Sequence, residues 1–235
     1  MISRPKDVNL PGPGAVFDLR VTPGTVRDQT YQRLRQAIIS GHFAPGQRLV
    51  ERDLCELVGV SRTSIREALR LLEADKLIVG EPHKGPCVAT LTAETAATIY
   101  EVRSVLESLA GQLAATRATE DEIQALERSV KDFEEAAGSG DLPLLVTIAA
   151  RFYEILLTAS RNPTIHEILN SLNARIAILR TTSMSDPGRS ILSAAEMREI
   201  ALAITSRDPR RAATACATHV DRAAAAAKKH LAKDT

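Results

Sequence analysis

The sequence contains no tryptophan, and its three tyrosines and four phenylalanines amount to only 3% of 235 residues. Hydrophobic residues still make up 44% of the chain, so its apolar content is mostly aliphatic. Strands favour aromatic and β-branched side chains, whereas alanine and leucine favour helices. The composition therefore favours a mainly helical chain over a β-sandwich, and the length allows one or two domains.

Cysteine is also scarce. Cys55, Cys87 and Cys216 are odd in number and too widely spaced for a zinc-binding pattern, which is typical of proteins in a reducing compartment. No apolar run reaches the roughly 20 residues that a membrane-spanning helix needs, and the N-terminus lacks the pattern of a secretion signal. We expect a cytoplasmic protein with no membrane contact.

The chain has little excess charge of either sign, because its net charge is +1. Residues 25–90 carry ten Lys and Arg against eight Asp and Glu, whereas residues 91–235 carry seventeen against nineteen. The weak excess of positive charge therefore lies in the N-terminal part of the chain.

The pattern of periodicity divides the chain into three parts. Prolines and glycines crowd residues 1–24, which should form a flexible N-terminal arm. Short helices and extended runs follow up to about residue 91, and long helices occupy the rest. We expect one domain at 25–91 and a second at 92–235.

Three short helices and a hairpin are predicted in the first domain. The helices cover about 25–40, 51–58 and 61–74, and the extended runs cover 77–79 and 87–91. Gly59 is a typical helix stop, and Ser61 is a natural cap for the third helix. This order of elements is typical of a winged helix-turn-helix.

The second domain is predicted to be an all-helical antiparallel bundle of about six helices. Breakers such as Asn162-Pro163 and Asp208-Pro209 separate its helices, and Thr119 with Glu122 matches a capping box. Six aliphatic residues of its first helix, at about 92–116, are spaced for one buried face. They are Ile99, Val102, Val105, Leu106, Leu109 and Leu113. Such a bundle is large enough to enclose a small-molecule pocket.

The third helix of the first domain carries the clearest functional pattern. Arg62, Arg66 and Arg70 recur every four residues on one side, and the other side is apolar, with Ile65, Leu69 and Leu72. An arginine can hold a guanine edge with two hydrogen bonds, so this helix is suited to a DNA groove. The alternative is a solvated face with ion pairs to Glu67 or Glu73, and Ser61 could be only a helix cap.

These motifs, taken together, resemble the GntR superfamily of bacterial transcription regulators, in the FadR-like branch that joins a winged helix to an FCD-type helical domain. The residues that carry the resemblance are Ile39-Ser40-Gly41, Pro45-Gly46-Gln47-Arg48-Leu49, Glu51-Arg52-Asp53-Leu54, Val60 through Leu69, Tyr100-Glu101-Val102-Arg103 with Glu107, and Asn162-Pro163. Where the family usually turns with glycine after the third helix, this chain has Lys76, which predicts either a strained turn or a different pairing at the exit of that helix.

The resemblance implies which residues contact DNA. They are Arg52, Ser61, Arg62, Thr63, Ser64, Arg66 and, on the wing, His83 and Gly85. We also predict a homodimer, joined mainly through the helical domains, that presents two recognition helices to a palindromic operator in double-stranded DNA and acts as a repressor. The N-terminal arm could also touch DNA.

Many FCD domains hold a divalent metal, and here the resemblance predicts that the metal is lost. The family's ligand positions are occupied by Ala149, Tyr153, Met197 and His219. One histidine with a methionine and a phenol cannot replace a set of converging donors. We expect no metal and no cofactor.

A small-molecule effector is expected in the second domain instead. The candidate residues are Arg103, Tyr153, Asn173, Arg175 and His219. Arg103 matches a position that the family often uses near its ligand, and a buried arginine favours a carboxylate or phosphate. The alternative is a structural pair between Arg103 and Glu107.

Two other functions compete with a metabolite-controlled regulator. One is a DNA-binding regulator that no longer senses a ligand. The other is an enzyme that pairs the thiol of Cys216 with His219, three residues later. Because a buried cysteine beside a histidine is usually structural and no other catalytic motif is present, we expect no enzymatic activity.

Overall fold

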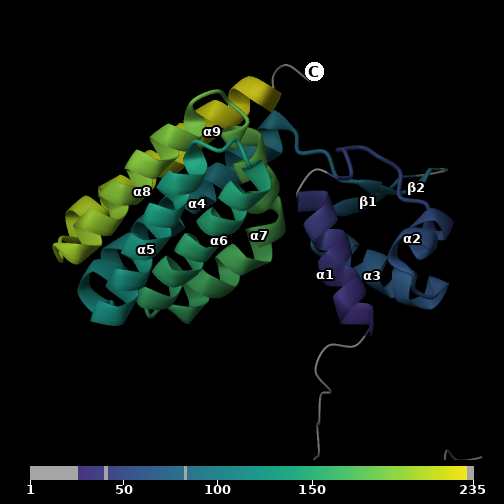
Figure 1. Cartoon of the computed structure of the whole chain (residues 1–235), viewed down its shortest axis with the longest axis horizontal. Coiled ribbons are helices and arrows are strands. Elements are labelled where there is room, and N and C mark those ends of the chain that lie inside the picture. Colours follow the sequence, from purple (N-terminus) through teal and green to yellow (C-terminus); the bar gives the residue numbers. More distant parts are fainter. Residues whose placement is uncertain (1–25, 40–41, 82–83, 232–235) are drawn as a thin grey trace, which may run out of the picture.

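The structure, a computed structural model, describes residues 26–39, 42–81 and 84–231 and has two lobes (Figure 1). The small lobe contains α1 (Val26–Ile39), α2 (Glu51–Val58), α3 (Arg62–Ala74), β1 (Ile78–Glu81) and β2 (Gly85–Val88). The large lobe contains α4 (Ala93–Arg117), α5 (Glu120–Ala137), α6 (Leu142–Ala159), α7 (Pro163–Met184), α8 (Arg189–Thr205) and α9 (Pro209–Leu231). A winged helix-turn-helix and a six-helix bundle, both predicted from the sequence, are therefore confirmed in the part described.

The helix ends in the small lobe follow from local chemistry. Gly59 adopts a left-handed φ of 73° and donates its N–H to Cys55, which ends α2. The Ser61 side chain accepts the N–H of Ser64 and so caps α3. Lys76 takes the left-handed turn after α3 with a φ of 59°, a conformation that costs an L-residue about 1–2 kcal/mol.

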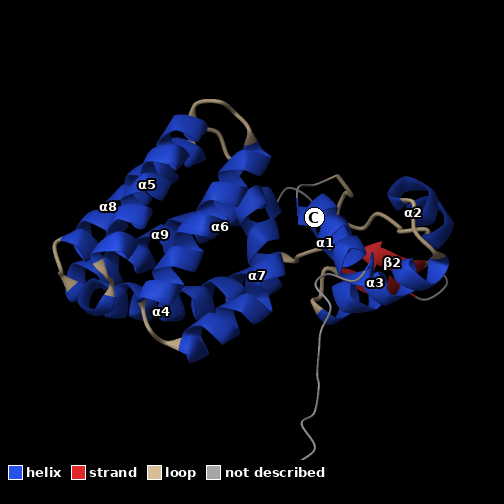
Figure 2. Cartoon of the chain, turned by 60° about the horizontal axis from the view of Figure 1, so that its bottom comes forward, coloured by secondary structure: helices blue, strands red, loops and turns tan. Residues whose placement is uncertain are grey.

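The hairpin, red in Figure 2, pairs nearer its tip than the sequence predicted. β1 and β2 are antiparallel with Ile78 opposite Val88 and Glu81 opposite Gly85, whereas the predicted strands were 77–79 and 87–91. The prediction was wrong because it followed apolar side chains, and the backbone hydrogen bonds of a ladder extend through small and polar residues as well.

The large lobe begins each of several helices with a side-chain cap. The capping box of Thr119 and Glu122 is present at α5, and Asp141 and Asn162 cap α6 and α7. α6 is long and apolar enough to cross a membrane, but half of it is buried, and it packs against α4, α5 and α7. It is therefore a packed helix of the bundle.

The buried face of α4 differs from the prediction. Val102, Val105 and Leu109 are 42%, 68% and 38% exposed, whereas Arg103 and Glu107 are buried. α4 packs along α9, and small residues let the two backbones approach, so that a Cβ added at Gly111 would lie 2.6 Å from the Cys216 sulfur.

The two lobes meet where α1 faces α7 (Figures 1 and 2). Ala174 of α7 joins the hydrophobic core of the small lobe, and Ile39 of α1 packs with Ala177. The Thr181 hydroxyl donates a hydrogen bond to the Ile39 carbonyl at 3.2 Å. α7 therefore contacts the small lobe both by apolar packing and by a hydrogen bond.

Candidate DNA-binding surface and interior pocket

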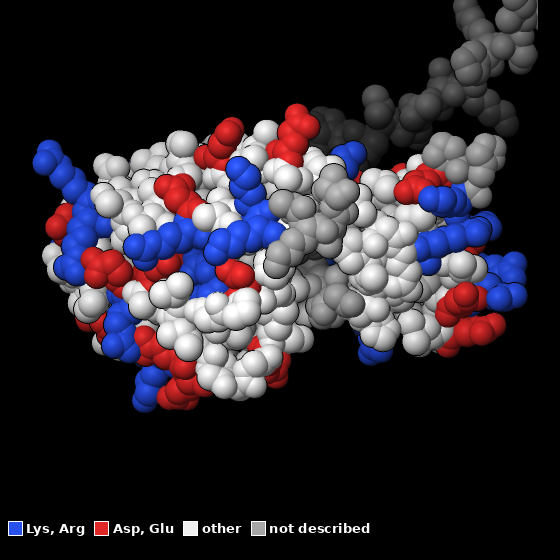
Figure 3. Space-filling view, turned by 90° about the horizontal axis from the view of Figure 1, so that it is seen from above, with Lys and Arg blue, Asp and Glu red and all other residues white. Residues whose placement is uncertain are grey.

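The three arginines of α3 lie on its solvent-facing side, because the opposite side forms the core of the small lobe. Ile65 and Leu72 are fully buried, whereas Arg62, Arg66 and Arg70 are exposed. Lys and Arg side chains also stand out at the outer end of this lobe in Figure 3, among a few acidic ones. The apolar stripe thus fixes which face α3 presents to a partner.

Two of these arginines are paired with carboxylates in the free protein. The Arg66 Nε lies 2.9 Å from Glu51 on α2, and Arg70 lies 2.7 Å from Glu67. The sequence anticipated the pair with Glu67 and missed the pair with Glu51, which joins two helices. Exposed pairs of this kind contribute at most about 1 kcal/mol, so a phosphate or a base edge can replace the carboxylate.

The hydroxyl residues lie at the N-terminal end of α3. Ser61 caps the helix, which the sequence offered as the alternative to a DNA contact, and its Oγ lies 3.1 Å from the Ser64 Oγ. Thr63 is exposed beside them. The first N–H groups of a helix attract anions, so this end of α3 is suited to a phosphate.

Arg52 and Gly85 complete the predicted surface as far as it is described. Arg52 is exposed on α2 and pairs with its neighbour Asp53 at 3.2 Å. Gly85 begins β2 with a φ of 80°, a value that suits glycine. His83 lies outside the described residues.

Arg103 and Glu107 form a buried ion pair in the large lobe. The Arg103 Nε lies 2.7 Å from Glu107, and the two side chains are 1% and 2% exposed. Its Nη1 atom has no hydrogen-bond partner among the described residues. The geometry therefore matches the structural pair between Arg103 and Glu107 that the sequence offered as an alternative, and it leaves the Arg103 Nη1 atom without a partner among the described residues.

A narrow pocket of about 30 Å³ lies beside this pair, between α4, α6 and α7. Two of the predicted effector residues, Tyr153 and Asn173, line it, together with Glu107 and Arg180. The guanidinium of Arg180 lies 4.5 Å from the centre of the Tyr153 ring. Sequence reasoning missed Arg180, although it follows Asn173 by seven residues and so shares its face of α7.

His219 is tied to a carboxylate. Its Nδ1 lies 2.7 Å from Glu196, which also accepts a hydrogen bond from Arg189 at 2.7 Å. Burial lowers the pKa of His219 below its usual value, although Glu196 opposes this shift. His219 is therefore neutral at pH 7, and its ring lies 6.0 Å from that of Tyr153, between centres.

Arg175 lies apart from the pocket. It does not line the cavity that Tyr153 and Asn173 share, and its Nε atom is buried without a hydrogen-bond partner among the described residues. Of the five predicted effector residues, only Tyr153 and Asn173 thus line this pocket.

The four family positions for a metal do not provide a donor set. Ala149 and Met197 are buried and offer no oxygen or nitrogen donor, and His219 is held by Glu196. Within the described residues, no three His, Cys, Asp or Glu side chains converge on one point. The residues present do not fit a divalent metal.

Cys216 and His219 are not arranged as a nucleophile and its base. Burial raises the pKa of the Cys216 thiol well above its usual value, so the thiol stays protonated. The hydrogen bond of His219 goes to Glu196 and not to the sulfur. This chemistry is that of a structural cysteine.

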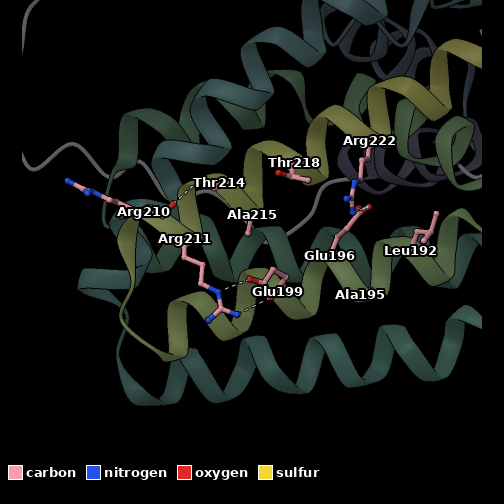
Figure 4. A pocket seen from close by; sticks show the side chains of 10 residues that line it. All are labelled: Leu192, Ala195, Glu196, Glu199, Arg210, Arg211, Thr214, Ala215, Thr218 and Arg222. Atoms are coloured by element: carbon pink, nitrogen blue, oxygen red, sulfur yellow. Dashed lines mark hydrogen bonds and ion pairs between the residues drawn. The ribbon is translucent and has the colours of Figure 1, made fainter.

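A larger hollow of about 470 Å³ lies on the outside of the bundle, between α8 and α9. Figure 4 shows that Arg211 and Arg222 each reach a carboxylate there, Glu199 and Glu196, while Arg210 points away. Both carboxylates that line this hollow are therefore already paired with arginines.

Comparison with known proteins supports this architecture. Residues 26–88 match the description "Bacterial regulatory proteins, gntR family", and residues 98–222 match "FCD domain". The chain therefore belongs to the gntR family of bacterial regulatory proteins, in the branch with an FCD domain, and it is a transcriptional regulator rather than an enzyme.

Individual relatives carry names of the same kind. The chain is 34% identical over 173 residues to the uncharacterized HTH-type transcriptional regulator YdhC of Bacillus subtilis, which covers 73% of this chain and 77% of the relative. It is 28% identical to the probable D-xylose utilization operon transcriptional repressor of Paenarthrobacter nicotinovorans, over 86% of this chain and 88% of that one. The solved structure of Escherichia coli McbR/YncC has a TM-score of 0.74 at 20% identity and covers 84% of this chain and 94% of its own, which shows a shared fold.

Proposed function

We propose that this regulator binds a palindromic operator as a homodimer, acts as a repressor in the cytoplasm, and changes its operator affinity when a small carboxylate-bearing metabolite binds in the helical domain. The observation that carries the proposal is that α3 presents an exposed arginine face while α7 both lines the interior pocket and contacts the lobe that contains α3. A relative named as a repressor supports the sign of regulation.

The DNA-reading residues are proposed from their positions. Arg62 and Arg66 would reach base edges in the major groove, where a bidentate contact to guanine gives about 1–3 kcal/mol of discrimination. Ser61, Thr63 and Ser64 would hold phosphates at the helix N-terminus. Arg52 on α2, together with His83 and Gly85 on the wing, would contact the flanking backbone.

The exposed apolar face of α4 supports dimerisation through the helical domain. Val102, Val105 and Leu109 form an aliphatic stripe on the surface of a helix that is otherwise packed into the bundle. Burying such a stripe against a second copy removes apolar area from water. Two copies related by a twofold axis would present their recognition helices about 34 Å apart.

Coupling between effector and operator would pass through α7. Asn173 and Arg180 face the pocket, while Ala177 and Thr181 contact the small lobe. A ligand that shifts α7, or the segment around residues 91–94 that joins the lobes, would stabilise one placement of the small lobes over another.

The test is selection of binding sites from a random pool of DNA duplexes by the full-length protein. We expect enrichment of an inverted repeat whose half-site centres lie one helical turn apart. Enrichment of no sequence, or of a single unrepeated site, would contradict the proposal.

A regulator that no longer senses a ligand remains the second candidate, because the pocket is narrow and the metal-binding positions are lost. Thermal unfolding across a library of metabolites separates the two, since a bound effector at a hundredfold excess over Kd adds about 2.7 kcal/mol of stability.

A further inference from the structure

Arg66 on α3 is held by a side chain of another helix. Its Nε atom donates to both carboxylate oxygens of Glu51, at 3.0 and 2.9 Å. Glu51 is the first residue of α2, and Leu54 of the same helix is buried in the small-lobe core with Ile65 of α3. The carboxylate that holds Arg66 therefore comes from a point that the core fixes, and not from the recognition helix itself.

The contact uses only one edge of the guanidinium. Both hydrogen bonds start from Nε, and neither Nη atom of Arg66 donates to any of the described residues. Arg70 differs, because it pairs through Nη1 with Glu67 on its own helix, at 2.7 Å. The two terminal nitrogens of Arg66 thus remain available together, and a guanine offers two acceptors to such a pair, O6 and N7. Guanine can bind there without displacing the carboxylate.

The carboxylate also changes what Arg66 prefers to bind. A guanidinium whose charge is balanced by a carboxylate still donates hydrogen bonds to the neutral edge of a base, whereas its attraction to a phosphate is weakened by the nearby negative charge. An arginine that is already ordered also loses less side-chain entropy when it binds a base. Both effects favour a base over the DNA backbone.

We propose that Glu51 is a positioning residue for DNA reading. It holds Arg66 through Nε, presents the two Nη atoms to a guanine, and disfavours contact between Arg66 and the phosphates of unrelated DNA. This inference rests on the proposed function, because it concerns how α3 reads the operator. Glu51 thereby raises the ratio of specific to non-specific affinity through Arg66.

The test measures binding of full-length Glu51→Gln by fluorescence anisotropy to the duplex that the wild type selects and to its scrambled counterpart. Glutamine keeps the size of the side chain and removes its charge. We expect the ratio of the two affinities to fall about three- to tenfold, which corresponds to the cost of ordering an arginine on binding. Binding to the scrambled duplex should tighten, and its log–log slope against salt should steepen by up to about 0.9, because Arg66 can then neutralise one phosphate.

Glu67→Gln is the matched control, since it removes the same charge from the partner of Arg70 on the recognition helix. It should change both affinities equally and leave their ratio as in the wild type. A double-mutant cycle with Arg66→Ala separates positioning from a purely structural role of Glu51 at the start of α2. Adding Glu51→Gln to Arg66→Ala should leave the ratio at the value that Arg66→Ala alone gives.

An unchanged ratio for Glu51→Gln would overturn the inference, as would an equal fall in the Arg66→Ala background or for Glu67→Gln. The single variant Arg66→Ala separates this failure from a failure of the proposed function. If Arg66→Ala lowers the ratio but Glu51→Gln does not, α3 reads DNA and only the positioning role is refuted. If Arg66→Ala leaves the ratio unchanged, the proposed reading face is refuted and the inference with it.

Discussion

Gly111→Ala tests the close packing of α4 on α9. A Cβ at this position would lie 2.6 Å from the Cys216 sulfur and 3.1 Å from the Ala212 carbonyl oxygen, both well inside normal contact. Overpacking costs about 1–3 kcal/mol, whereas replacing a helical glycine by alanine gains about 1 kcal/mol of helix propensity. The clash should win, with a net loss of about 1 kcal/mol and a fall in Tm of about 2–4 °C.

Two further variants make this prediction specific. Combining Gly111→Ala with Cys216→Ala removes the sulfur, so the double variant should lose less stability than the sum of the single losses. Gly138→Ala is the control, because a Cβ there meets nothing within 4 Å. The variants are compared by urea and thermal unfolding. A rise in Tm for Gly111→Ala, equal to that of the control, would refute the close approach of the two helices.

Two other predictions concern buried and strained groups. Burial lowers the pKa of His219 in the folded chain, so below the ordinary pKa of about 6.5 the unfolded chain takes up a proton before the folded chain does. The free energy of unfolding should therefore fall between pH 7 and 5.5, by at most about 1.4 kcal/mol per pH unit. Urea unfolding should show a flatter pH dependence for His219→Gln, whereas an unchanged slope there, or an equal flattening in the exposed-residue control His42→Gln, would count against the buried neutral imidazole. Lys76→Gly should raise Tm slightly, since relief of about 1–2 kcal/mol of left-handed strain exceeds the entropy that glycine adds to the unfolded chain; a lower Tm would show that the turn is not strained.

The order of helices and the caps of the fold could be predicted from the sequence, because caps and breakers are local signals. Gly59, Ser61 and the Thr119 capping box act as their chemistry requires. The inward face of α4 could not be predicted in this way. Periodicity favoured its aliphatic residues, whereas the bundle buries Arg103 beside Glu107 and leaves Val105 in solvent.

The candidate sites also contain features that a single helix determines and features that depend on contacts between helices. The exposed arginines of α3 follow from a single amphipathic helix, so their placement was accessible to sequence reasoning. The pair of Arg66 with Glu51 and the unpaired Arg180 depend on contacts between helices that are distant in sequence. A single sequence gives no register for such contacts.

The central claim is that α3 reads DNA sequence through Arg66, and fluorescence anisotropy with two duplexes tests it most directly. One duplex carries the site selected by the wild-type protein, and the other is its scrambled counterpart, each titrated at several salt concentrations. We expect Arg66→Ala to weaken binding to the selected duplex by about 1–3 kcal/mol and binding to the scrambled duplex far less, which lowers the specificity ratio. Equal losses on both duplexes, or an unchanged ratio, would contradict the account.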